Sequence, residues 1–167
     1  MRARRQLIKV LTEPFTVVES VTVGLACNAQ EAFDFMWDPD ASRVLNSDAF
    51  HGTTLPGTPA RAVGEVQVFL SRPGGVLRGT MMEVQSLVEG RRAVTRTITD
   101  TLENLQVLDI VPLDEESCRL TQELSTVVPA GASTHYVSTV RADHRLILDG
   151  VVVALVGQFG RAGAGTP

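Results

Sequence analysis

Residues 21–39 read VTVGLACNAQEAFDFMWDP and join three local signals in a short span. The first residues alternate between apolar and polar side chains, which is typical of a strand with one buried face. Asn28 then suits a helix N-cap, and Glu31 follows three residues later, where a capping box needs its carboxylate. Asp38-Pro39 ends the helix, because the residue before a proline is driven out of the helical conformation. The stretch therefore predicts a strand that leads directly into a short helix.

Similar signals predict further strands and helices on both sides of this stretch. The alternation predicts a first strand over Phe15–Ala26, and residues 40–46 predict a second short helix after the proline. Beyond a Gly-, Pro- and Thr-rich segment, Gly52–Pro59, five stretches of period two are separated by turn signals. They are Gly64–Ser71, Val76–Val88, Arg92–Thr99, Leu105–Leu113 and Cys118–Val128. Their connections are too short for parallel crossovers, so we expect an antiparallel meander.

A long helix is predicted at the C-terminal end. Ser133 or Thr134 can cap it, and the helical period continues to Phe159. At about 100° per residue, one side of this helix is apolar and must be buried. That side is formed by Val137, Val140, His144, Leu148, Val151 and Leu155, with Ile147 at its edge.

This order of elements resembles the helix-grip fold of the START and Bet v 1-like superfamily, also called the polyketide cyclase/dehydrase and lipid transport superfamily. Residues 21–39 look like the family's strand, helix start and Asp-Pro turn. The resemblance implies an α+β domain over residues 15–159, with a curved antiparallel sheet of about six to seven strands, two short helices and a long C-terminal helix over a cavity. Residues 1–14 are then an N-terminal extension and residues 160–167 a flexible tail.

Composition limits the classes of function. The chain has 167 residues, enough for one domain with a sizeable core. Its 44% hydrophobic and 20% charged residues are those of a soluble globular protein. A net charge of −4 argues against sequence-independent binding of nucleic acid. The most apolar stretch, Leu146–Phe159, is shorter than the roughly 20 residues that span a bilayer, so we expect no membrane insertion.

The sequence contains no motif for a metal or cofactor. Cys27 and Cys118 are far apart, without a CxxC spacing or clustered histidines, so neither a disulfide framework nor a zinc site is predicted. GxSxG, P-loop and HExxH motifs are absent. We therefore expect a reduced, cytoplasmic protein without metal or cofactor.

Three residues are the candidates for catalysis. His144 lies at the centre of the apolar side of the last helix, which in this fold faces the cavity, where a histidine can act as acid or base; the alternative is a core histidine bonded to a strand. Arg78 could bind a carboxylate or enolate in the cavity, or lie in solvent at a hairpin end. Asp109 alternates with Val107 and Val111 and so falls on an apolar face by parity, unless a bulge turns it to solvent.

A larger set of residues is predicted to line the cavity. Gln122 alternates with Leu120 and Leu124, so its amide is a candidate polar group of the cavity. The full predicted ligand-binding set is His144, Gln122, Thr95, Thr97, Met82, Phe69, Val140, Leu148 and Val151.

Three functions fit these features. The leading interpretation is a protein that binds a small hydrophobic ligand, such as a lipid, a polyketide or a related metabolite, in its cavity. The second is an enzyme similar to the family's polyketide cyclases/aromatases, with His144, Arg78 and Asp109 as its catalytic groups. The third is an interaction or chaperone-regulating protein that uses an outward surface at Val153 and Val156 for a partner or for a homodimer.

Overall fold

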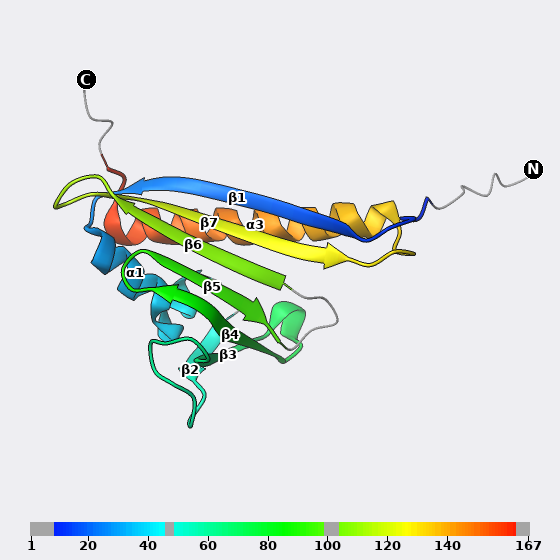
Figure 1. Cartoon of the computed structure of the whole chain (residues 1–167), viewed down its shortest axis with the longest axis horizontal. Helices are drawn as coiled ribbons and strands as arrows, with labels where there is room; N and C mark the ends of the chain where they lie inside the picture. The colour runs from blue at the N-terminus through cyan, green and yellow to red at the C-terminus, as the bar shows by residue number, and fades with distance from the viewer. Residues whose placement is uncertain (1–8, 46–48, 99–103, 163–167) are drawn as a thin grey trace, which may run out of the picture.

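The computed structural model describes residues 9–45, 49–98 and 104–162, apart from the Ser42 side chain (Figure 1). The elements are β1 (Phe15–Leu25), α1 (Ala29–Trp37), η1 (Pro39–Ala41), α2 (Ser42–Leu45), β2 (Ala49–Thr54), β3 (Val66–Ser71), η2 (Pro73–Gly75), β4 (Arg78–Val88), β5 (Arg92–Thr97), β6 (Asn104–Pro112), β7 (Cys118–Val128) and α3 (Thr134–Phe159). The predicted α+β class and helix-grip order of elements are confirmed.

The strands form one antiparallel sheet of seven strands in the order β1-β7-β6-β5-β4-β3-β2. From β2 to β7 each strand pairs with its neighbour in the sequence, as expected for a meander. The first strand then pairs with the last over its whole length, from Phe15 opposite Val128 to Leu25 opposite Cys118. The sheet therefore carries β1 and β2 at its two edges.

The helices cover one face of this sheet. Figure 1 shows α3 running along β1 and β7, and α1 lying at one end of the sheet. We call the covered face the inner face and the opposite one the outer face. On β6, Leu108 packs against the core and Ile110 is buried in it, so both lie on the inner face. Because side chains alternate along a strand, Val107, Asp109 and Val111 lie on the outer face.

The start of α1 has the predicted cap. The Asn28 side chain accepts a hydrogen bond from the Glu31 backbone N–H at 2.9 Å, and the Glu31 carboxylate accepts one from the Asn28 N–H at 3.1 Å. These bonds satisfy two donors that the first turn would otherwise leave free. The cap directs Phe33 and Trp37 into the core, where their rings stack with centroids 5.4 Å apart.

Two cysteines meet in the core next to this cap. Cys27 and Cys118 are buried free thiols, and Cys118 lies opposite Leu25, at the end of β1. Burial, followed by the neighbouring Cys118 thiol, raises the pKa of Cys27 to about 12. Burial also raises the pKa of Cys118. Both groups are therefore protonated packing residues at neutral pH.

Helix α3 buries the side predicted from its period. Ser133 caps it by accepting from the Tyr136 N–H at 3.0 Å. Val140 packs with Val17 of β1 and Val128 of β7, and Val151 and Leu155 belong to the main core. The apolar side of α3 therefore packs against β1, β7 and the main core, to which α1 also contributes.

Most boundaries differ from the sequence prediction by one or two residues, and two segments differ in kind. Strand β2 includes the start of the segment that was predicted to be a Gly-, Pro- and Thr-rich connection, because pairing with β3 imposes an extended conformation that the side chains do not signal. The start of the expected tail is ordered, since Arg161 bridges to Leu25 and the Ala162 N–H donates to the Gly24 carbonyl at 3.2 Å. Residues 163–167 of that tail, and residues 1–8 of the N-terminal extension, lie outside the described residues.

Candidate functional site

A partly open pocket of about 60 Å³ lies between the end of α1 and the inner face of the sheet. Met36 and Trp37 of α1 form one wall. The opposite wall comes from five successive strands, β3 to β7. Val84, Ala93 and Leu108 give this wall an apolar part, close to the main core. The pocket is therefore a gap in the packing between α1 and the sheet.

Strand register brings polar side chains together on the same wall. Gln67 of β3 pairs with Met82 of β4, and Thr95 of β5 pairs with Gln106 of β6. Gln122 of β7 lies opposite Leu108 of β6. Gln106 is two residues before Leu108 and on the same face, so Gln106 and Gln122 are neighbours on the inner face. The polar or thioether side chains that line the pocket are Gln67, Met82, Thr95, Gln106 and Gln122. The wall is thus rich in amides although the surrounding core is apolar.

Two of the amides form a short chain of hydrogen bonds. The Gln122 side-chain N–H donates to Gln106 Oε1 at 3.5 Å, and the Gln106 side-chain N–H donates to Met82 Sδ at 3.2 Å. Gln122 is only 6% exposed, and its Oε1 has no hydrogen-bond partner among the described residues. A buried acceptor without a partner is costly, so this oxygen is a candidate contact for a bound molecule.

The third amide is fixed by a buried carboxylate. Gln67 donates to the Trp37 carbonyl at 3.1 Å and to Glu65 Oε1 at 3.0 Å. Glu65 is 2% exposed and also accepts from the Thr54 hydroxyl at 3.2 Å and from the Arg61 backbone N–H. These bonds compensate the buried charge. Glu65 and Gln67 were not predicted as site residues, although two polar side chains on the same face at the start of an apolar strand were a visible signal in the sequence.

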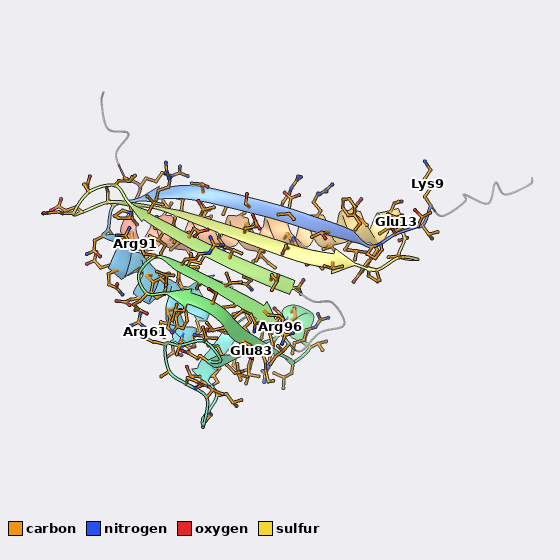
Figure 2. The ribbon with its side chains drawn as sticks, viewed as in Figure 1. Lys9, Glu13, Arg61, Glu83, Arg91 and Arg96 are labelled. Carbon is orange, nitrogen blue, oxygen red and sulfur yellow. The ribbon has the colours of Figure 1, made fainter. Side chains whose placement is uncertain are left out.

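The loop that carries Arg61 is tied to α1 by charge. Figure 2 labels Arg61 in this loop; its guanidinium pairs with Asp34 and, at 3.0 Å, with Glu89. The Asp34 hydrogen bond raises the pKa of Arg61, and the Arg61 hydrogen bond lowers that of Asp34. This cluster holds the loop next to the helix that forms one wall of the pocket.

His144 lies outside the pocket. It is 6% exposed, and its Nε2 is 2.8 Å from the Thr126 hydroxyl, which donates to Asn104 Oδ1. The hydroxyl has a single hydrogen, so Nε2 is the donor and Nδ1 carries the lone pair. Nδ1 has no partner among the described residues, and burial lowers the pKa of His144. The histidine is therefore neutral, with a strand side chain as its partner.

Arg78 and Asp109 also lie away from the pocket. Arg78 is exposed at the first position of β4. Asp109 is on the outer face, where it pairs with Arg92 at 2.6 Å, and a second outer pair joins Arg96 to Glu83 at 3.0 Å (Figure 2). Asp109 does share a face with Val107 and Val111, as predicted, but this apolar face is the outer one and not the side of the cavity. The structure does not bring His144, Arg78 and Asp109 together.

The predicted ligand-binding residues divide into two groups. Met82, Thr95 and Gln122 line the pocket. The others lie on the inner face or on α3 without reaching it; they are Thr97, Phe69, Val140, His144, Leu148 and Val151. The expectation that the buried side of α3 faces the cavity is therefore wrong for this pocket. That side is covered by β1, β7 and the core instead.

Of the two residues predicted for an outward surface on α3, one is exposed and the other is not. Val153 is 73% exposed, whereas Val156 is partly buried and packs against the main core. Within the described residues, no group of three or more His, Cys, Asp or Glu side chains is arranged to hold a metal ion. No helix in the described part of the chain is long and apolar enough to cross a membrane.

Comparison with protein-family models and with curated proteins finds no match. Solved structures do match. A START superfamily protein from Mycobacterium smegmatis is 20% identical with a TM-score of 0.68, over 85% of this chain and 96% of that one. Truncated norcoclaurine synthase from Thalictrum flavum is 13% identical with a TM-score of 0.66, over 87% and 94%.

An aromatase/cyclase from Streptomyces sp. R1128 is 14% identical with a TM-score of 0.63, over 91% of this chain and the whole of that one. These proteins agree with this chain over nearly its whole length at low sequence identity, so the likeness concerns the arrangement of the backbone. The chain has the helix-grip fold of the START and Bet v 1-like superfamily.

Proposed function

We propose that the protein binds a small, largely apolar molecule in the pocket between α1 and strands β3 to β7. The observation that carries the proposal is the buried, unpartnered Gln122 Oε1 in a pocket with an otherwise mostly apolar lining. Ligand sites in proteins have this composition, with a few polar groups that orient an apolar ligand.

The size of the pocket limits how such a molecule is held. Pockets for drug-sized ligands have roughly 300–1,000 Å³, well above the 60 Å³ found here. Met36 and Met82 line the pocket on opposite walls, and methionine side chains change conformation at low cost. Binding therefore requires either a very small molecule or a shift of these two side chains that opens the pocket further.

The relatives support binding without deciding the ligand. One structure of norcoclaurine synthase is a complex with dopamine and hydroxybenzaldehyde, and it has a TM-score of 0.64 to this chain. The aromatase/cyclase keeps enzymatic turnover as the alternative function. Among the described residues that line the pocket here, none has an ionisable side chain that titrates near neutral pH, so acid–base catalysis lacks a group and simple binding is favoured.

A pocket-filling variant tests the proposal. Ala93 lines the pocket, whereas Val94 next to it points to the outer face. We expect indole to raise the melting temperature of the wild type, because a ligand that binds only the native state stabilises it. Ala93→Leu should abolish this rise and Val94→Leu should keep it. An equal rise in wild type and Ala93→Leu would place binding elsewhere and contradict the proposal.

A further inference from the structure

The ligand class follows from the charges and hydrogen bonds of the pocket, and this step rests on the proposed function. The described lining residues carry amides, a hydroxyl, thioethers, an indole and aliphatic groups, but no charge. An ionised carboxylate or ammonium group would lose its hydration there without an opposite charge. Glu65 does not line the pocket, and its carboxylate is 2% exposed and already accepts three hydrogen bonds, so it offers a ligand no direct ion pair. The pocket selects against charged ligands.

The hydrogen-bond inventory then distinguishes among neutral ligands. Gln122 Oε1 is a strong acceptor without a partner. The Gln106 N–H is bonded to Met82 Sδ, a weak acceptor, and can exchange it for a better one. A ligand hydroxyl supplies both missing partners, since it donates to Gln122 Oε1 and accepts from the Gln106 N–H. An ether or ketone only accepts, and so leaves the Gln122 oxygen buried and unpaired.

We infer that this pocket recognises an uncharged alcohol or phenol, with the hydroxyl bound between Gln122 Oε1 and the Gln106 amide. The apolar part of the ligand lies against Met36, Trp37 and Met82. One face of Trp37 is already occupied by Phe33, so the pocket meets the remaining surface of the indole. The volume fits the hydroxyl end of the ligand, and the methionines adjust to the remainder.

The test is an NMR titration that follows the side-chain amide signals of the glutamines. Three probes of similar size are compared: phenol, anisole, in which the hydroxyl is methylated, and benzoate, which is charged at neutral pH. We expect phenol to shift the Gln106 and Gln122 amide signals and to bind at least about tenfold more tightly than anisole, because anisole leaves the acceptor unpaired. Benzoate should leave these signals unchanged.

The variants assign the preference to one residue. Gln122→Leu keeps the approximate size and removes the acceptor, so phenol and anisole should bind it equally. Gln85→Leu, at an exposed position of β4, is the matched control and should keep the preference. Gln122→Met provides the same comparison if the leucine variant does not fold, as judged by circular dichroism.

The outcomes separate this inference from the proposed function. Equal binding of phenol and anisole to the wild type, a preference that survives in Gln122→Leu, or tightest binding of benzoate would each overturn the inference while leaving a binding pocket. If none of the three probes binds but indole still stabilises the wild type and not Ala93→Leu, the pocket binds ligands and the alcohol assignment is wrong. If indole fails as well, the proposed function is contradicted together with the inference.

Discussion

The inner face of the sheet has a dry, closely packed region where α3 covers β1 and β7, and a polar region at the pocket, which β3 to β6 form together with Gln122 of β7. Along β1 and β7, Val17, Leu120 and Val128 are at most 5% exposed, and they pack against α3 and the core. Around the pocket, the same face carries the polar or thioether side chains of Gln67, Met82, Thr95, Gln106 and Gln122. The first region has the close packing of a protein interior, and the second retains unfilled space and an unsatisfied acceptor.

This difference assigns separate tasks to the two regions. Close packing stabilises a fold, and each buried methylene that is lost leaves a cavity. A site for ligands needs the opposite, since its polar groups are paired fully only when the ligand is bound. We therefore expect substitutions in the dry region under α3 to change stability, and substitutions around the pocket, including Gln122 of β7, to change binding.

The largest expected effect is at the dry region. Leu155 is fully buried in the main core, so Leu155→Ala should lower the free energy of unfolding by about 3 kcal/mol. Thr95→Val in the pocket nearly keeps the volume and should change it by less than about 1 kcal/mol. Urea unfolding monitored by circular dichroism measures both. Equal losses would remove the distinction between the two regions.

A smaller effect concerns His144, the polar group that α3 buries against β7. Its pKa is lowered by burial, with Glu19 and Asp143 acting weakly in the opposite direction; Arg141 and Arg145 pair with Glu19. The unfolded chain therefore takes up a proton at higher pH than the native state. The contribution of His144 to the free energy of unfolding should be fully present above about pH 7.5. It should fall as the pH drops through about 6.5, by up to about 1.4 kcal/mol per pH unit.

The matched variants for this prediction are His144→Gln and His135→Gln, the second at an exposed position near the start of α3. Free energies of unfolding are compared from pH 8 to pH 5, roughly the range over which a histidine titrates. The slope should weaken in His144→Gln and persist in His135→Gln. An unchanged slope in His144→Gln would assign the acid sensitivity to other groups.

The smallest expected effect is tested by thiol labelling, which probes the packing around the two buried cysteines without a substitution. Burial, together with the neighbouring Cys118, raises the pKa of Cys27 to about 12, so almost no thiolate is present at pH 8. Native protein should resist iodoacetamide, while protein in urea should incorporate two labels, one at each of Cys27 and Cys118, as counted by mass spectrometry. Rapid labelling of the native state would show that the dry region opens easily.

Much of the fold was predictable because local signals and tertiary structure agree. The Asn28–Glu31 capping box, the alternation of β1 and the helical period of α3 each specify one local structure, and each is observed. Strand β2 was not predictable, since Gly52, Thr53 and Thr54 carry no apolar alternation and the strand exists through its pairing with β3. Its conformation is imposed by a neighbour distant in sequence.

The site was less predictable, because a period of two separates two faces without saying which one is covered. Gln122 and Asp109 both alternate with apolar residues, yet Gln122 lines the pocket and Asp109 pairs with Arg92 on the outer face. Likewise, the helical period identifies the buried side of α3 but not the surface that buries it. Glu65 and Gln67 acquire their meaning only where the strands place them beside Trp37.

The most direct test of the central claim is a crystal structure of the protein with bound indole. The account predicts density for the ligand between Trp37 and the Gln106–Gln122 wall, with Met36 or Met82 moved to enlarge the pocket. An unchanged, empty pocket with indole bound elsewhere on the molecule would contradict the account.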